Sequence, residues 1–295
     1  MKILRATHLG MCFGVRDAIT LAVQHAAAKP LTILGDLVHN ETVLSRLRSQ
    51  GVKIEHQVAD VSTSTVMITA HGASDRTMNR ARDQGLRVIE ATCPLVQFAH
   101  RALRKLVDEG CHPVIIGRRD HVEVRGMTED LAEYDVVLTE ADVMRLTERS
   151  RFGVVAQTTQ PIDKVRRLVG LLRVRFPEAD VRFADTVCQP TKQRQSAATE
   201  LARQCDVVVV IGGEHSNNTR ELVETCRQDC ASVFHVQTAD DLRKEWFAGA
   251  NIVGITAGTS TPDSVVDDAQ AWLEHFAAFH ANQEATLEPA HAMAL

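Results

Sequence analysis

Three features are missing from this chain, and each absence excludes a class of protein. No run of lysine and arginine occurs, and the net charge is −5, which argues against a general nucleic-acid-binding surface. No apolar run is long enough to span a bilayer. The N-terminus, MKILRATHLG, lacks the apolar core of a signal peptide. We therefore expect a cytoplasmic protein that binds neither membranes nor nucleic acids.

What the chain does contain is an ordinary globular composition and seven cysteines. Its 295 residues are 44% hydrophobic and 24% charged, and this length predicts two or three domains. Thiols stay reduced in a cytoplasm, so structural disulfides are not expected. The composition therefore favours metal binding or catalysis as the use of some of the cysteines.

Short apolar strands alternate with amphipathic helical patterns along the chain. The expected strands lie in residues 2–7, 31–38, 66–70, 86–92, 113–117, 135–139, 153–157, 181–187, 206–212, 232–236 and 251–258. Strands rich in valine and isoleucine that alternate with helices predict an α/β fold with parallel sheets covered on both faces. In such sheets, ligands bind beyond the carboxyl ends of the strands.

The strand ends form an internal repeat. The first set of strand ends carries a cysteine, in HLGMCFGV, EATCPLV and DTVCQPT. The second set carries a glycine, in ILGDLVHN, IIGRRDHV and VIGGEHSN. The third set carries an alanine before polar residues, in ITAHGAS, VVAQTTQ and ITAGTST. The three sets recur in the same order about ninety residues apart. The repeat predicts three small α/β domains at residues 1–93, 94–188 and 189–280, followed by a disordered tail at 281–295.

Three such domains around a pseudo-threefold axis would turn their polar strand ends toward one central cavity. Cys12, Cys93 and Cys188 would then converge, and converging thiolates in a reducing compartment indicate a soft metal centre. Three ligands are one fewer than the four cysteines of an ordinary [4Fe–4S] cluster, which leaves one iron open to substrate. Cys93 directly precedes Pro94, at the start of a predicted helix, whose dipole is expected to lower the pKa of the thiol. Cys111, Cys205, Cys226 and Cys230 lack this context and are interpreted as packing residues.

Polar side chains gather at the same strand ends. Histidines occur at His39, His71 and His121, and protonated imidazoles would suit an anionic ligand. The hydroxyl and amide groups at this level are Thr158, Thr159, Ser216, Asn217, Asn218 and Ser260. Each precedes a helix, so N-capping and phosphate binding are both open interpretations. Glu123, two residues after His121, is a carboxyl that could pass protons in a water-poor site.

At these residues the sequence resembles the 4-hydroxy-3-methylbut-2-enyl diphosphate reductase (LytB) family. The motifs GMCFGV, LVHN, AHG, ATCPLV, HVEV, QTT, DTVC, RQ and TAGTSTPD occur in the family's order, and the resemblance extends to about residue 280. It implies three α/β domains around a [4Fe–4S] cluster. It also implies reductive removal of an allylic hydroxyl, which gives isopentenyl and dimethylallyl diphosphates in the last step of the non-mevalonate isoprenoid pathway.

The resemblance also implies residue roles. The cluster ligands would be Cys12, Cys93 and Cys188, and Glu123 would supply a proton through Thr158. The diphosphate contacts would be His39, His71, His121, Ser216, Asn218 and Ser260, with Asn217 standing where a serine is usual. The implied partners are an allylic diphosphate and an electron donor such as ferredoxin or flavodoxin.

Three segments depart from the family pattern and keep alternatives open. HVEVRGM replaces HPEVEGT, SNN replaces SSN, and GRRD is more basic than the usual loop. A paralogue that acts on a related allylic diphosphate is one alternative. Another is a three-cysteine [4Fe–4S] enzyme of the quinolinate synthase type, which needs no external reductant, and a third is a non-enzymatic iron–sulfur sensor.

Overall fold

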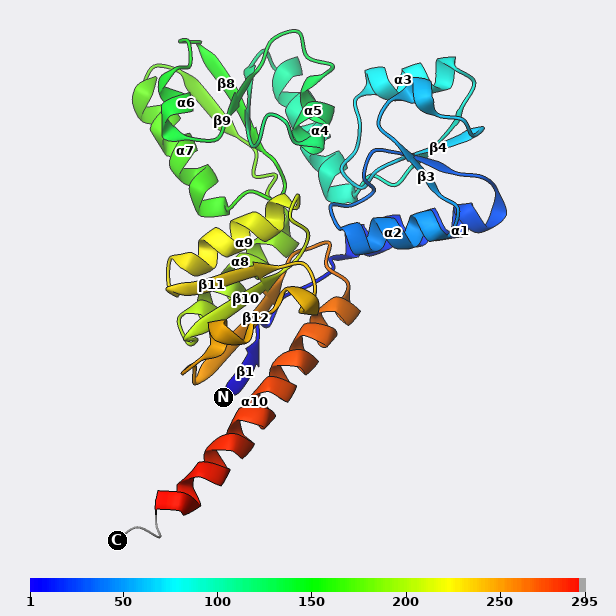
Figure 1. Ribbon diagram of the computed structural model, residues 1–295. Coiled ribbons are helices and arrows are strands. Elements are labelled where there is room, and N and C mark those ends of the chain that lie inside the picture. The colour runs from blue at the N-terminus through cyan, green and yellow to red at the C-terminus, as the bar shows by residue number, and fades with distance from the viewer. Residues whose placement is uncertain (292–295) are drawn as a thin grey trace. The chain divides into compact units, whose positions relative to one another are not determined.

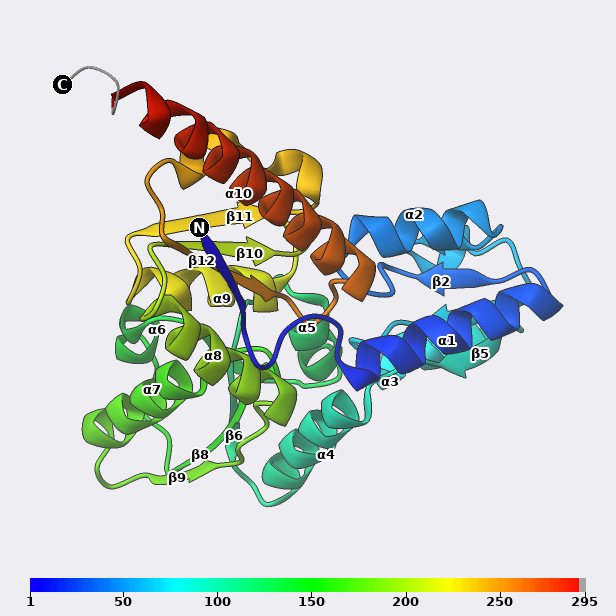
Figure 2. The same ribbon diagram turned by 90° about the horizontal axis from the view of Figure 1, so that it is seen from below.

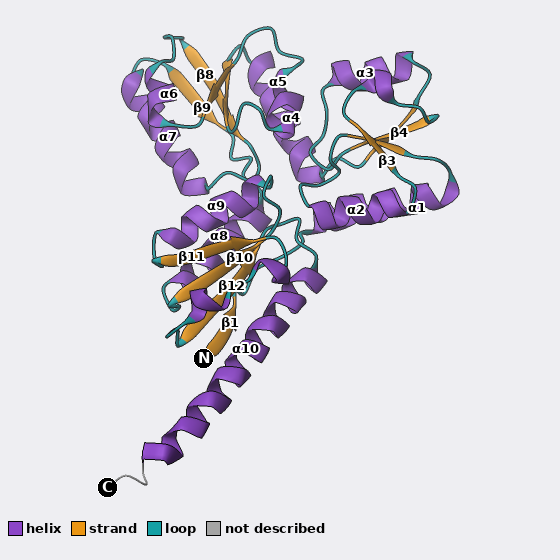
Figure 3. Cartoon of the chain, in the orientation of Figure 1, coloured by secondary structure: helices purple, strands orange, loops and turns teal. Residues whose placement is uncertain are grey.

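The protein was analysed as a computed structural model that describes residues 1–291, with side chains to residue 279. Helices and strands alternate along these residues, and the strands form three four-stranded sheets (Figures 1 and 3). Every pairing between neighbouring strands is parallel. The prediction of an α/β fold with three parallel sheets is therefore confirmed.

The first complete sheet has the strand order β3-β2-β4-β5. Its strands are β2 (Thr32–Leu34), β3 (Lys53–Glu55), β4 (Thr65–Ile68) and β5 (Arg87–Glu90). The helices around it are α1 (Phe13–Ala28), α2 (Glu41–Ser49) and α3 (Asp75–Asp83), with a short 3-10 helix η1 (Val58–Asp60). Val66 of β4 packs against Ala81 of α3, and α1 and α2 lie on the opposite side of the sheet from α3 (Figure 1).

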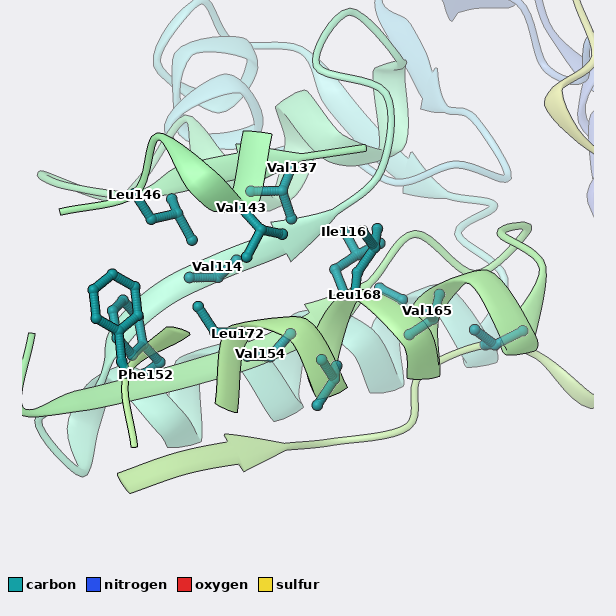
Figure 4. Close-up of a cluster of buried hydrophobic side chains, with 14 residues drawn as sticks. Val114, Ile116, Val137, Val143, Leu146, Phe152, Val154, Val165, Leu168 and Leu172 are labelled. Atoms are coloured by element: carbon teal, nitrogen blue, oxygen red, sulfur yellow. The ribbon is translucent and has the colours of Figure 1, made fainter. Parts of the chain in front are cut away.

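The second sheet repeats this design with the order β7-β6-β8-β9. Its strands are β6 (His112–Ile116), β7 (Asp135–Val137), β8 (Arg151–Ala156) and β9 (Asp180–Phe183). On one face, valines of β6 and β8 pack against Leu168 and Leu172 of α7 (Ile162–Arg175) and Val143 of α6 (Glu140–Met144), as Figure 4 shows. On the other face, Ile115 and Val155 pack against α4 (Pro94–Asp108) and α5 (Val122–Thr128).

The third sheet has the order β1-β12-β10-β11 and draws its strands from both ends of the chain. They are β1 (Lys2–Arg5), β10 (Val207–Ile211), β11 (Ser232–Val236) and β12 (Ile252–Ala257). One face packs against α8 (Gln189–Ala202) and α9 (Asn217–Arg227), and the other against α10 (Asp263–His291). Short 3-10 helices η2 (Ala239–Asp241) and η3 (Lys244–Phe247) connect β11 to β12.

A single topology underlies all three sheets. In each, the first strand lies between the second and the third, and a fourth strand forms the far edge. β1 occupies this fourth position in the third sheet, where it pairs with β12. Cys12, Cys93 and Cys188 each follow a fourth strand, namely β1, β5 and β9. The internal repeat is thus a structural repeat in which the chain's first strand completes its last sheet.

The described chain divides into two compact units. Unit 1 comprises Met1–Met11 and the chain from Gln193 onward, and unit 2 comprises Cys12–Lys192. Unit 2 contains the first two sheets and all three of the cysteines at fourth-strand ends. The domain boundaries near residues 93 and 188, and the placing of the three sheets around one cavity, stay predictions.

Some expected strands end earlier than predicted, such as those that end at Leu34 and Phe183, and two elements differ in kind. β3 was not expected, because its three residues KIE are short and only partly buried. Residues 281–291 continue helix α10 where a disordered tail was expected, and residues 292–295 lie outside the described part of the chain. Alanine, glutamine and glutamate at residues 281 and 283–285 are good helix formers and favour continuation of the helix into this segment.

Candidate functional site

The candidate site residues lie where the order of strands reverses. In a sheet of this topology the connections leave in opposite directions from the first and third strands, which creates a crevice beyond their carboxyl ends. His39 follows β2 and His71 follows β4; His121 follows β6 and Thr158 follows β8. In unit 1, Ser216 follows β10 and Ser260 follows β12. The topology therefore places these side chains in the positions where α/β sheets bind ligands.

Two of the three cysteines occupy the N-cap positions of helices. Cys12 is the N-cap residue of α1 and Cys93 that of α4. Cys188 immediately precedes α8. The starts of α1 and α4 are in close contact, because a Cβ atom added to Gly14 would lie 2.5 Å from the Sγ atom of Cys93. Cys12 is also close enough to raise the pKa of both Cys93 and Cys188.

The thiol pKa values correct one prediction. The helix dipole was expected to lower the pKa of Cys93, but burial raises it. Burial also raises the pKa of Cys188 to about 11. Desolvation disfavours the thiolate more strongly than the helix start favours it, since the dipole provides only a partial charge. A bound cation is what would convert these buried thiols to thiolates.

Hydrogen-bond donors nevertheless surround the sulfur atoms. The backbone N–H groups of Leu95 and Val96 donate to Cys93. The Sγ of Cys188 lies 3.1 Å from the Oγ1 of Thr191, and the backbone of Thr191 also bonds to this thiol. Sulfur ligands of iron–sulfur clusters accept such bonds, so the donor set fits a thiolate-held cluster. Sequence reasoning missed Thr191, although its position three residues after Cys188 resembles that of a capping residue.

The three histidines lie together in unit 2. The ring centroids of His39 and His71 are 4.4 Å apart and stacked, and the ring of His121 lies 5.1 and 5.5 Å from those of His39 and His71. Their ligand nitrogens lie within 4.8 Å of one another, and no other described group of three or more His, Cys, Asp or Glu side chains is this tight.

His71 is neutral rather than protonated. Burial, followed by the neighbouring imidazoles of His39 and His121, lowers its pKa well below the usual value. It bonds to the backbone of Asp36, while its buried Nδ1 has no hydrogen-bond partner among the described residues. The expectation of protonated imidazoles is therefore wrong for His71 in the absence of a ligand. A buried nitrogen without a partner is suited to a ligand that brings its own charge.

Glu123 and Thr158 form a buried pair at adjacent strand ends. The backbone N–H of Thr158 donates to Oε1 of Glu123 at 2.6 Å, and its hydroxyl donates to Oε2 at 3.0 Å. Only 1% of Glu123 is exposed, and burial raises the pKa of this carboxyl to about 7. Desolvation disfavours the charged carboxylate, which is the cause of this shift. His121, the N-cap residue of α5, accepts from the N–H of Glu123, so one short helix fixes both side chains.

The family departures leave this pair in place. Arg125 points to solvent, and Gly126 lies against the backbone of Ala73, two residues after His71. The backbone N–H of Arg118, in the basic loop, donates to the side chain of Gln157. Of the altered residues in HVEVRGM, Arg125 is exposed and Met127 is buried in the apolar core of the second sheet, while Glu123 and Thr158 keep both of their hydrogen bonds.

Unit 1 holds a second set of buried polar groups at the start of α9. Ser216 is the N-cap residue, and its hydroxyl accepts from the N–H of Thr219 at 3.3 Å. Asn217, Asn218 and Ser260 are at most 5% exposed. The Nδ2 of Asn218 has no hydrogen-bond partner within the described chain. Capping explains Ser216, whereas the unpartnered amide of Asn218 is suited to an anion at a helix N-terminus.

Comparisons with known proteins identify the family of the chain. The family model described as LytB protein matches residues 3–274. A curated 4-hydroxy-3-methylbut-2-enyl diphosphate reductase of Anaeromyxobacter sp. (strain Fw109-5) is 37% identical over 276 residues, which cover 92% of this chain and 97% of that one. The reductase of Geobacter sulfurreducens is 35% identical over 279 residues, covering 94% and 98%.

Two solved structures, both titled as hydroxy-methyl-butenyl diphosphate reductases, share the fold. The (E)-1-hydroxy-2-methyl-but-2-enyl-4-diphosphate reductase of Plasmodium falciparum superposes with a TM-score of 0.85 at 26% identity, covering 90% of this chain and 86% of that one. A structure of (E)-4-hydroxy-3-methyl-but-2-enyl diphosphate reductase, described as the terminal enzyme of the non-mevalonate pathway, gives 0.67 at 34% identity, with coverage of 93% and 100%. Within the described residues, no helix has the length and apolar character needed to cross a membrane.

Proposed function

Because the chain belongs to the LytB family, we propose that it reduces 4-hydroxy-3-methylbut-2-enyl diphosphate to isopentenyl and dimethylallyl diphosphates in the cytoplasm. The allylic C–O bond breaks, one C–H bond forms, and two electrons and two protons are consumed with release of water. The observation that carries the proposal is the set of three thiols in unit 2, each after a fourth strand.

We assign the [4Fe–4S] cluster to Cys12, Cys93 and Cys188. Three thiolates leave one iron without a protein ligand. When bound, such a cluster would supply electrons one at a time to a substrate beside it. The N–H groups of Leu95 and Val96 and the Thr191 hydroxyl would stabilise the thiolates through hydrogen bonds to sulfur.

Glu123 is the proposed source of the proton that leaves with the hydroxyl as water. With a pKa of about 7, a substantial share of this carboxyl is protonated near neutrality. A protonated Glu123 donates to the Thr158 hydroxyl 3.0 Å away, and that hydroxyl can pass its own proton to the substrate oxygen. The fixed N–H of Thr158 keeps the carboxyl oriented during the transfer.

The diphosphate is assigned to His39, His71 and His121 of unit 2 and to Ser216, Asn217, Asn218 and Ser260 of unit 1. A diphosphate carries about three negative charges near neutrality, and buried charge must be matched by donors. Since His71 is neutral without a ligand, substrate binding would draw protons onto the imidazoles. Binding is therefore expected to tighten as the pH falls from 8 to 6.

The test is anaerobic turnover after reconstitution with iron and sulfide. With dithionite as reductant, the native chain should convert the hydroxylated diphosphate to both products. Cys93→Ser should lose iron and activity, whereas Cys226→Ser should retain both, because Cys226 lies in the core of unit 1. Full iron content in Cys93→Ser would contradict the ligand assignment. Turnover without any reductant would instead favour chemistry of the quinolinate synthase type.

A further inference from the structure

Two aromatic rings are exposed at the helix starts that follow Cys12 and Cys93. Phe13, the first residue of α1, is 47% exposed, and Phe98 of α4 is 46% exposed. Burying such a ring is worth about 1.5–3 kcal/mol, so rings left in water are candidates for contact with a partner. A single exposed ring is ordinary, but here both flank the proposed cluster ligands.

The two rings belong to adjoining helix starts within unit 2. Gly14 lies close to the Cys93 thiol, so the start of α1 is next to the start of α4. The two helix starts lie near each other in Figure 2. On α1 the inward side carries Gly14, Ala18 and Ala22, which are buried. Helical spacing places Phe13 and Arg16 on the opposite, exposed side.

The exposed stripe of α4 is apolar near the cysteine and basic farther on. Pro94, Phe98, Arg101 and Lys105 recur at intervals of three and four residues, and all four are exposed. Arg101 has no ion-pair partner among the described residues. We call the exposed side chains of Phe13, Arg16, Pro94, Phe98, Arg101 and Lys105 the entry face.

Charge on the entry face is opposite to that of the whole chain. It carries Arg16, Arg101 and Lys105, and its acidic neighbours are Asp17 on α1 and Glu109, which forms an ion pair with Lys105 at 3.9 Å. The basic groups still outnumber the acidic ones, while the chain as a whole has a net charge of −5. A basic patch on an acidic protein selects acidic partners by steering their approach. Phenylalanine and arginine are also types that are enriched where proteins meet.

We propose that the entry face is the docking site of a small acidic one-electron carrier protein. This inference rests on the proposed function, which requires two electrons for each substrate. Each encounter would oxidise one reduced carrier by one electron, and two encounters would complete a turnover. Electron transfer weakens steeply with distance, so the carrier must approach the cysteines, and Phe13 is the chain neighbour of Cys12. Redox encounters bury less than about 1,200 Å² in total, an area that the ends of two helices can supply.

The experiment compares two reductants on the same reconstituted enzyme. Phe98→Ser and Arg101→Glu are assayed with dithionite and with a reduced acidic carrier, using a [2Fe–2S] ferredoxin and a flavodoxin in turn. The matched controls are Val174→Ser, an apolar residue 78% exposed on α7, and Arg80→Glu, an exposed arginine on α3. Carrier binding is also measured without substrate, by titration calorimetry, so that docking is read independently of turnover.

Both test variants should raise the carrier KM and Kd about tenfold, with dithionite rates unchanged within about twofold. The controls should match the native chain, and added salt should weaken binding to the native chain more than binding to Arg101→Glu. Unchanged carrier binding in both test variants, or equal losses in the controls, would overturn the docking site. Absence of turnover by the native chain with dithionite would overturn the proposed function itself, and the docking proposal with it.

Discussion

Replacing Glu123 with glutamine should separate the stability of the protein from its catalysis. Glutamine has the same shape, and its carbonyl oxygen can accept the N–H of Thr158 as Oε1 of Glu123 does. Its amide nitrogen can donate to the Thr158 hydroxyl, but it has no proton to release at neutral pH. The hydrogen-bonded geometry is therefore kept while the acid is lost.

The magnitude of the stability effect follows from the pKa of Glu123. Its value is raised from 4.5 to about 7 by burial, so folding favours the protonated form. At about 1.4 kcal/mol per unit, the native carboxyl costs about 3 kcal/mol of stability once the pH exceeds 7. The cost is absent below pH 4.5 and grows through the window between the two values. Glu123→Gln should therefore be more stable than the native chain at pH 8 and nearly equal to it at pH 4.5.

Two assays measure these effects. Urea unfolding of metal-free protein at a series of pH values gives the stability difference, and anaerobic turnover with dithionite gives kcat. The variant should lose about 10²- to 10⁴-fold in kcat. Native kcat should fall above pH 7 as Glu123 loses its proton, whereas the residual rate of the variant should not follow that titration. A stability difference that does not change with pH, or near-native kcat in the variant, would refute the reasoning.

Three further predictions test the rest of the site. Gly14→Ala should reduce iron retention, because the added Cβ atom would lie 2.5 Å from the Sγ atom of Cys93 and displace that thiol. The control is Gly170→Ala, which has open space around the added atom. This variant should retain iron, and its free energy of unfolding should increase by about 0.5–1 kcal/mol. His71→Asn should raise the KM for substrate more than it lowers kcat, and it should weaken the pH dependence of substrate binding. Inorganic diphosphate should compete with substrate, and a lack of competition would count against the anion site. Ser216→Ala removes the N-cap of α9 and should cost about 1 kcal/mol of stability in chemical unfolding, with an additional increase in KM only if the hydroxyl also contacts substrate.

The fold was largely predictable because buried strands appear in the sequence as short apolar runs. The apolar runs that end at Ile68, Ile116 and Ile211 correspond to central strands, whereas the partly buried β3 left no such run. The sheet that β1 joins was not predictable. Its partner β12 lies about 250 residues away, and no local sequence pattern indicates which strand β1 pairs with.

The sequence predicted which strand ends carry the site residues, but it did not predict all of their pKa shifts. The repeat placed Glu123 and Thr158 at matching strand ends, and the structure brings them into hydrogen-bond contact. The sign of the pKa shift at Cys93 was wrong, because the helix dipole can be read from the sequence while the depth of burial depends on the whole fold. Ligation of iron and contact with diphosphate stay predictions.

The position of β1 has a consequence for synthesis of the chain. β1 is synthesised about 250 residues before β12, the strand that it pairs with. Unit 2 is complete once Lys192 has emerged, whereas unit 1 must wait with an unpaired N-terminal strand until β12 is available. All three proposed iron ligands belong to unit 2, so the nascent chain can present them together before the chain beyond Gln193 has been translated.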